Sequence, residues 1–147
     1  MTETQLSDAD FERLLEFRDG LRRFLHWSEE RAHEAGMTPA QHQLLLAVRG
    51  HGTGHGFGRG AGGGSGPSMS DLAGHLLLRH HSTVELVDRA EGAGLVVRAT
   101  DPDDHRVVRV SLTAEGEGRL HALAEAHLQE LSRTRAGFAG LWSHLPD

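Results

Sequence analysis

"RHHSTVELVDRAEGAGLVVRATDPDDHRVVRVSLTAEG", residues 79–116, is the stretch that decides the fold. Apolar residues recur at helical spacing in its first part, which predicts a helix over 80–93 that ends at Gly94. The valine-rich runs 95–99 and 106–112 flank the turn sequence "TDPDDH", and together they predict a β-hairpin. A helix with a polar face followed by such a hairpin is typical of structures that grip DNA.

Helix signals before this stretch complete a helix-turn-helix. Thr38 is expected to cap a helix that has Pro39 at its first position, and Gln41 closes a capping box. A short helix over 71–78, capped by Ser70, then precedes the polar-faced helix described above. Two helices joined by a short break and followed by a hairpin predict a winged helix-turn-helix.

Long apolar helices are expected at both ends of the chain. Ser7 caps the first helix, and Thr113 caps a long helix that is followed by a separate short one. The first helix is apolar over a broad arc that includes Phe11, Leu14, Leu15, Phe17, Leu21, Phe24, Leu25 and Trp27. The short final helix carries Phe138, Leu141, Trp142 and Leu145. Because a helix with a broad apolar arc is usually buried from two sides, we expect a second copy of the chain to cover one side.

A glycine-rich segment, residues 51–68, interrupts the helix-turn-helix region. It contains nine glycines, and the entropy lost on ordering them predicts a flexible loop. Apart from this loop, the chain is predicted to be mainly α-helical with a small β-hairpin wing. Its 147 residues fit one domain.

The composition excludes several classes of protein. The chain has no cysteine, which excludes disulfides, thiolate metal sites and cysteine-based redox sensing. No apolar run approaches the roughly 20 residues of a membrane span. The acidic N-terminus lacks the features of a signal peptide, so a cytoplasmic protein without membrane contact is expected. Neither a Gly-x-Ser-x-Gly motif nor a phosphate loop is present, and the sequence indicates no enzyme and no cofactor.

The same motifs carry a resemblance to the MarR family of bacterial transcriptional regulators. The chain resembles this family in "MTPAQHQLLLAVRG", in "SDLAGHLLLRHHSTVELVDRAEGAGLVVR" and above all in "DPDDHRVVRVSLTAEG". The residues that meet the family pattern in the last motif are Asp101, Asp104, Arg106, Leu112, Thr113 and Gly116. Two features depart from the pattern. His105 stands where many members have a second arginine, and the glycine-rich segment replaces a short connection.

The resemblance implies a homodimeric repressor that binds a palindromic operator in double-stranded DNA and is released by a small effector. Residues 1–35 and 113–147 would form the dimerisation helices, and residues 36–112 the winged helix-turn-helix region. The effector would lie in a crevice between these parts, where aromatic walls and a few polar groups favour a small aromatic or carboxylate-bearing molecule. The side chains that could line this crevice are Phe24, His26, Trp27 and His42.

The exposed side of the helix over 80–93 is expected to enter the major groove, and the resemblance suggests that the hairpin reaches the minor groove. The residues expected to contact DNA are Arg79, His80, His81, Ser82, Thr83, Glu85, Arg89, His105 and Arg106. The Glu85 carboxylate could accept a hydrogen bond from cytosine, or it could form a surface pair with the arginine four residues later. Asp101 or Asp104 is expected to orient the guanidinium of Arg106 toward DNA. The alternative is that such an Arg–Asp pair only stabilises the hairpin.

The net charge of −6 raises the question of how this chain would hold DNA. Residues 71–110 alone carry five arginines against seven acidic residues. Attraction to phosphate drives nonspecific DNA binding. We therefore expect weak binding to random DNA, a shallow dependence on salt, and a strong need for two half-sites at once.

Twelve histidines leave another function open. A metal-responsive regulator or metal-binding protein could use His51 and His55 of the glycine-rich segment, or a pair on one helix face such as His26 and His33. No known zinc-ligand spacing is present, so no metal ligands are assigned. The acidic wing also leaves open a dimeric interaction protein that does not bind DNA.

Overall fold

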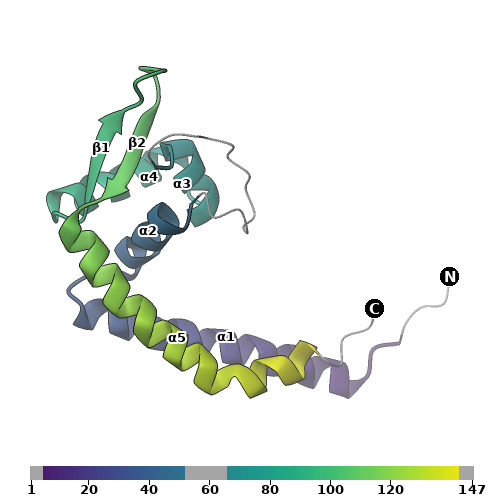
Figure 1. Ribbon diagram of the computed structural model, residues 1–147. Coiled ribbons are helices and arrows are strands. Elements are labelled where there is room, and N and C mark those ends of the chain that lie inside the picture. The colour runs from purple at the N-terminus through teal and green to yellow at the C-terminus, as the bar shows by residue number, and fades with distance from the viewer. Residues whose placement is uncertain (1–4, 52–65, 143–147) are drawn as a thin grey trace.

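The computed structural model describes residues 5–51 and 66–142, and it confirms a mainly α-helical fold with a β-hairpin wing. In order, the elements are α1 (Asp8–Glu34), α2 (Pro39–Gly50), α3 (Met69–Leu76), α4 (His80–Gly92), β1 (Val96–Thr100), β2 (Val108–Leu112) and α5 (Ala114–Trp142). Helices α2, α3 and α4 gather with the hairpin at one end of the molecule, as Figure 1 shows. Helices α1 and α5 lie side by side and extend from this winged part as a long arm.

Capping boxes fix where the helices begin. The Thr38 hydroxyl accepts a hydrogen bond from the Gln41 backbone at 3.1 Å, and the Gln41 side chain accepts one from the Thr38 backbone at 3.1 Å, as predicted. The predicted cap of α3 was wrong, because Ser68 and not Ser70 occupies that position. Ser68 is followed three residues later by Asp71, which accepts from the Ser68 backbone at 2.9 Å, whereas Ser70 has no such acid.

The C-terminal end of the predicted glycine-rich loop is structured. The Pro67 carbonyl accepts a hydrogen bond from the Val110 backbone at 3.0 Å, and Ser68 pairs with Arg109 as an isolated bridge. Gly66 adopts a φ of 103°, and a side chain there would overlap the Val110 carbonyl oxygen. This segment therefore lies along β2 of the two-stranded hairpin and is joined to it by a single bridge; residues 52–65 lie outside the described residues.

Helix α5 is continuous from Ala114 to Trp142, which corrects the predicted break before a separate short final helix. The sequence "SRTRAGFAG", residues 132–140, contains no proline, and an isolated glycine in a helix costs only about 1 kcal/mol. The helix therefore runs through this segment. No helix in the described ranges is long and apolar enough to cross a membrane.

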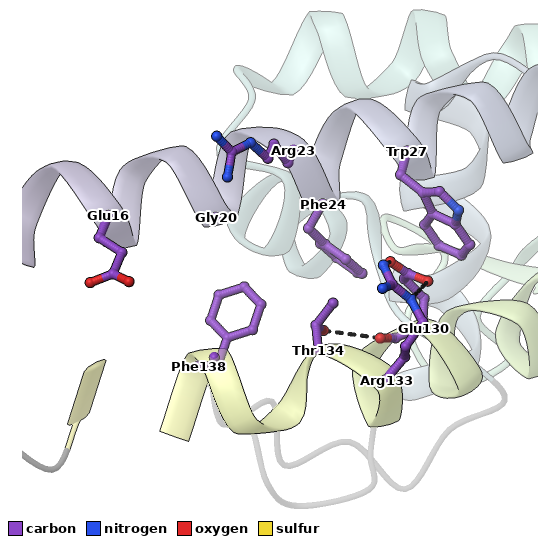
Figure 2. Close-up of a pocket in the computed structure, with 10 residues that line it drawn as sticks. Glu16, Gly20, Arg23, Phe24, Trp27, Glu130, Arg133, Thr134 and Phe138 are labelled. Atoms are coloured by element: carbon purple, nitrogen blue, oxygen red, sulfur yellow. Dashed lines mark hydrogen bonds and ion pairs between the residues drawn. The ribbon is translucent and has the colours of Figure 1, made fainter. Parts of the chain in front are cut away.

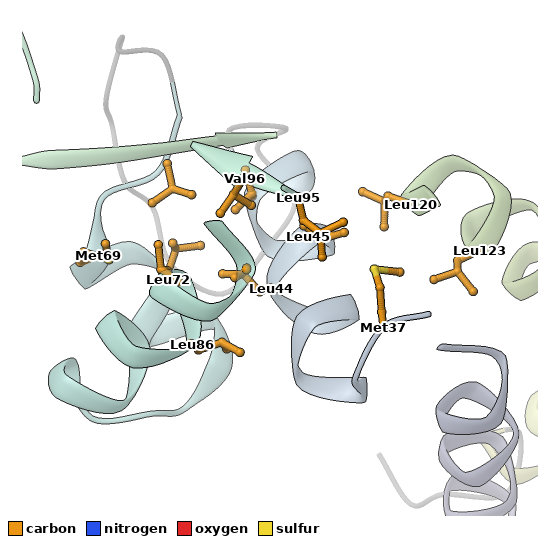
Figure 3. Packing of buried hydrophobic residues seen from close by; sticks show 14 residues of the cluster. Met37, Leu44, Leu45, Met69, Leu72, Leu86, Leu95, Val96, Leu120 and Leu123 are labelled. Carbon is orange, nitrogen blue, oxygen red and sulfur yellow. The ribbon is translucent and has the colours of Figure 1, made fainter. Parts of the chain in front are cut away.

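One hydrophobic core joins the winged part to the beginning of α5. Its buried members are Met37, Leu44, Leu45, Val48, Met69, Leu72, Leu86, Val87, Ala90, Leu95, Val96, Val110, Leu120 and Leu123. Figure 3 shows Leu120 and Leu123 of α5 beside Met37 and Leu45. The first turns of α5 thus pack with the winged part, and the later turns belong to the arm.

The arm leaves a row of apolar side chains uncovered. On α1, Leu15 is 61% exposed, and beside it a row of four, Phe11, Leu14, Leu21 and Leu25, has exposed fractions between 39% and 58%. At 100° per residue these four side chains fall within an arc of roughly 80°. On α5, Leu128 and Leu131 are also exposed. We call the four α1 residues the outer stripe.

Candidate nucleic-acid interface and ligand pocket

Helix α4 has one buried side and one exposed side, as its periodicity predicted. The buried side chains are Thr83, Leu86, Val87 and Ala90. The exposed side carries His81, Glu85, Asp88 and Arg89, and Ser82 is half-buried at its edge. An exposed polar side on the second helix of a helix-turn-helix is the surface that reads base edges in the major groove.

The inclusion of Thr83 among the expected DNA contacts was wrong. Thr83 is completely buried, and its hydroxyl donates a hydrogen bond to the Arg79 carbonyl at 3.0 Å. The side chain therefore supports the first turn of α4 from inside the winged part, where DNA has no access. Arg79, His80 and His81 remain exposed at that end of the helix.

The two carboxylates that were expected to orient Arg106 bind different arginines. Asp104 accepts hydrogen bonds from the Arg106 side chain at 3.1 and 3.3 Å, which lower the pKa of Asp104. The Arg106 side chain is 90% exposed and projects from the hairpin next to the exposed His105. Of the two alternatives for orienting Arg106, the structure therefore selects Asp104.

Asp101 instead organises the inside of the turn. It accepts from Arg109 Nε at 2.6 Å and from the Asp103 backbone at 2.7 Å. These hydrogen bonds, first that from Arg109, lower the pKa of Asp101. Arg109 also donates to the Gly66 carbonyl at 3.2 Å, so it connects the segment before α3 to the turn.

A second arginine ties the hairpin to α4. Arg98 on β1 forms ion pairs with Asp88 and Glu91, both on α4. Hydrogen bonds from the Arg98 backbone and then from its side chain lower the pKa of Glu91. Asp88 thus braces the hairpin, and charged contacts hold α4 against the wing.

The arm contains a pocket of about 430 Å³ between α1 and α5. Figure 2 shows Phe24 and Trp27 from α1 and Phe138 from α5 around this space. The charged and polar residues that line it are Glu16, Arg23, Glu130, Arg133 and Thr134. Its walls are therefore aromatic and its rim is charged, which suits a small molecule with an apolar body and a polar group.

The predicted effector residues do not all meet in this pocket. Phe24 and Trp27 line it, but His26 does not, because its side chain is 74% exposed and lies 3.4 Å from Glu30. His42 lies instead against His127, a residue that was not expected to line the effector crevice. Phe138 was also missed as a pocket residue, because nothing local shows that it faces α1.

His127 links the arm to the winged part. Its ring centroid lies 4.8 Å from that of Trp27 on α1 and 4.8 Å from that of His42 on α2. Its Nδ1 donates to the Leu123 carbonyl at 2.7 Å, so in the neutral ring Nε2 accepts from the Ser28 hydroxyl at 2.7 Å. Burial, and then the proximity of His127, lowers the pKa of His42.

His42 should make the fold less stable in mild acid. Since the pKa of folded His42 lies below the ordinary value of 6.5, the unfolded chain takes up the proton first as the pH falls. The free energy of unfolding should therefore decrease as the pH drops through 6.5, measured by denaturant melts followed by circular dichroism. His42→Gln should flatten this decrease, whereas His33→Gln, on the exposed side of α1, should not. An unchanged pH dependence in His42→Gln would contradict this assignment.

The described residues bear on the metal-binding alternative. Within them, no group of three or more histidine, cysteine or acidic side chains could hold a metal ion. His51 and His75 approach to 3.2 Å between ring nitrogens, with Asp71 at 3.6 Å from the far side of His51. His55 lies outside the described residues.

Sequence comparisons point to one family. A model of the MarR family matches residues 35–107, from the end of α1 into the hairpin. The HTH-type transcriptional regulator YsmB of Bacillus subtilis (strain 168) is 42% identical over 50 residues, which are 34% of this chain and 34% of that protein. The match thus spans about a third of that relative's length.

Solved structures share the fold over most of the chain. The MarR family transcription regulator SP03579 has a TM-score of 0.71 at 21% identity and covers 88% of this chain and 78% of its own. The complex of Staphylococcus aureus MepR with DNA has a TM-score of 0.60 at 20% identity, with coverages of 86% and 93%. The complex of NadR with 4-hydroxyphenylacetate has a TM-score of 0.66 at 22% identity, with coverages of 92% and 84%.

Proposed function

This chain belongs to the MarR family of transcriptional regulators, which it joins through residues 35–107, and we propose that it is a homodimeric repressor. It binds a palindromic operator in double-stranded DNA through two winged parts, and a small effector releases it. The family is one of regulators rather than enzymes. The observation that carries this proposal is the exposed polar side of α4 next to an exposed wing arginine, Arg106.

Two groups of side chains would contact DNA. From α4 and its first turn they are Arg79, His80, His81, Ser82, Glu85 and Arg89, which enter the major groove. From the wing, His105 and Arg106 reach the minor groove or its phosphates, with Asp104 holding the guanidinium extended. The solved complex of MepR with DNA supports this docking, since MepR shares the fold.

The outer stripe supports the homodimer. Monomeric proteins rarely expose a continuous row of large apolar side chains, and a second copy can cover it with the same row. Residues 1–35 and 113–147 would then provide the dimer contacts, and residues 36–112 the DNA-binding region. Leu120 and Leu123 pack in the core of that region, so α5 connects the dimer contacts rigidly to the winged part.

The pocket between α1 and α5 is the proposed effector site. Its aromatic walls and the guanidinium of Arg23 suit a small aromatic molecule that carries a carboxylate. NadR, which shares the fold, is solved with 4-hydroxyphenylacetate, a molecule of this class. A ligand wedged between the two helices would change the direction of the arm and so the spacing of the two winged parts.

The experiment that tests the function is a titration of duplex DNA from the region upstream of the protein's own gene, followed by fluorescence anisotropy. We expect tight binding to a palindrome, weak binding to scrambled DNA of the same composition, and a salt dependence shallower than that of regulators with many phosphate contacts. The reason is that Arg98 and Arg109 are engaged within the protein and add little attraction to phosphate. Failure to bind any palindrome at low salt would favour a dimeric interaction protein instead.

A further inference from the structure

The winged part neutralises most of its own carboxylates. Of the seven acidic residues within 71–110, five have polar partners in the protein. Arg98 forms ion pairs with Asp88 and Glu91. Arg109 pairs with Asp101, and Arg106 pairs with Asp104. The fifth carboxylate, Asp71, accepts a hydrogen bond from the Ser68 backbone. Among the described residues, only Glu85 and Asp103 of the seven have side-chain carboxylates without an ion pair or hydrogen bond. The acidic excess is therefore mostly internal, and two free carboxylates remain.

Glu85 occupies the centre of the exposed side of α4. The four buried residues of this helix centre on a direction that is nearly opposite to Glu85 at 100° per residue. His81 lies one turn before it and Arg89 one turn after it on the same side. No ion pair joins Glu85 to Arg89, although both are described, so the surface pair considered from the sequence does not form. Glu85 therefore faces whatever α4 reads, between His81 and Arg89.

A carboxylate in this place can select bases but cannot strengthen binding to the backbone. It repels phosphate, and in the major groove only the amino groups of cytosine and adenine offer it a hydrogen bond. Adenine carries the acceptor N7 beside its amino group, which repels the second carboxylate oxygen, whereas cytosine carries a C–H group there. Guanine and thymine present no donor to it.

We propose that Glu85 is the specificity determinant of this regulator, which requires a cytosine in each half-site and weakens binding to other DNA. This rests on the proposed function, because it assumes that α4 enters the major groove. The flanking His81 and Arg89 then attract the DNA on either side of Glu85. Glu85 weakens binding unless a base with a suitable amino group lies opposite it. A chain with few unpaired arginines near the DNA thus gains selectivity between base sequences from a carboxylate that disfavours the wrong bases.

The test is selection of binding sites from a pool of duplexes with a randomised centre, using the full chain. Wild type should enrich a palindrome with cytosine at one fixed position of each half-site. Glu85→Ala should bind all four bases there almost equally, a loss of discrimination of roughly 5- to 100-fold, and should bind random DNA more tightly. Glu85→Gln should shift the preference to adenine, because an amide pairs with both N6 and N7 of that base. Asp103→Ala, which removes the other free carboxylate, should keep the cytosine.

Each other result is decisive. A wild-type motif that Glu85→Ala retains unchanged would overturn this inference and leave the proposed function intact. A guanine at the position that changes in Glu85→Ala would mean that Glu85 acts through Arg89, which overturns the direct contact. If wild type enriches no sequence, the proposed function fails, and this inference fails with it.

Discussion

Gly116→Ala is expected to lower the free energy of unfolding by about 3 kcal/mol, the upper part of the range for overpacked cores. Gly116 lies in the first turn of α5, directly against the backbone of Leu95. A methyl group there would overlap the Leu95 carbonyl oxygen and lie 3.0 Å from its carbonyl carbon. Leu95 belongs to the buried core, and its carbonyl accepts a hydrogen bond from the Thr113 backbone at 3.1 Å. Neither the backbone of Leu95 nor the start of α5 can therefore move easily to relieve the overlap.

The matched control is Gly118→Ala, two residues further along the same helix. An added methyl group at Gly118 meets nothing within 4 Å, so this variant should gain stability by up to about 1 kcal/mol through helix propensity. Thermal unfolding followed by circular dichroism would separate the two, with a decrease of roughly 10 °C for Gly116→Ala. Equal midpoints for the two variants would show that α5 can shift away from Leu95.

This contact gives a physical reason for the glycine of the "LTAEG" motif. Thr113 donates from its hydroxyl to the Gly94 carbonyl at 2.6 Å and accepts from the Gly116 backbone at 3.0 Å. The threonine thus fastens the start of α5 to the turn between α4 and β1, and the glycine lets the two backbones approach. The motif is the joint at which the arm leaves the winged part.

The elements of this fold could be predicted because their signals are local. A turn rich in aspartate between two valine runs predicts a hairpin wherever it occurs, and the Thr38 capping box marks a helix start within four residues. The same reasoning failed where two local signals compete, as with Ser68 and Ser70. For Thr83 the helical periodicity was right and only its naming as a DNA contact was wrong, since its hydroxyl bonds to the helix backbone.

The partners within the site could not be predicted, because they depend on how distant segments meet. The preference of Asp101 for Arg109 follows from how the turn folds back over β2. The contact of Ser28 with His127 joins residues 99 apart, and nothing near His127 in the sequence marks it. The residue types of the candidate site were therefore visible in the sequence, and the contacts between them were visible only in the structure.

The double variant Leu21→Asp/Leu25→Asp is expected to be monomeric and to bind a full operator at least about 100-fold more weakly than wild type. Both leucines belong to the outer stripe and are exposed in the single chain, at 39% and 52%. Carboxylates there would have to be desolvated against a second copy, which opposes dimerisation, while the fold of each chain should persist. Light scattering after gel filtration would give the mass, and circular dichroism would confirm the helices.

The control is Leu46→Asp, which places the same charge on a leucine of α2 that is 54% exposed and outside the outer stripe. This variant should remain dimeric and keep its affinity for the operator. A DNA with one half-site separates the two effects of the double variant. If the winged part is intact, wild type and the double variant should bind that half-site equally weakly, because only a dimer gains from a second one. A double variant that is still dimeric would place the interface elsewhere than on the outer stripe.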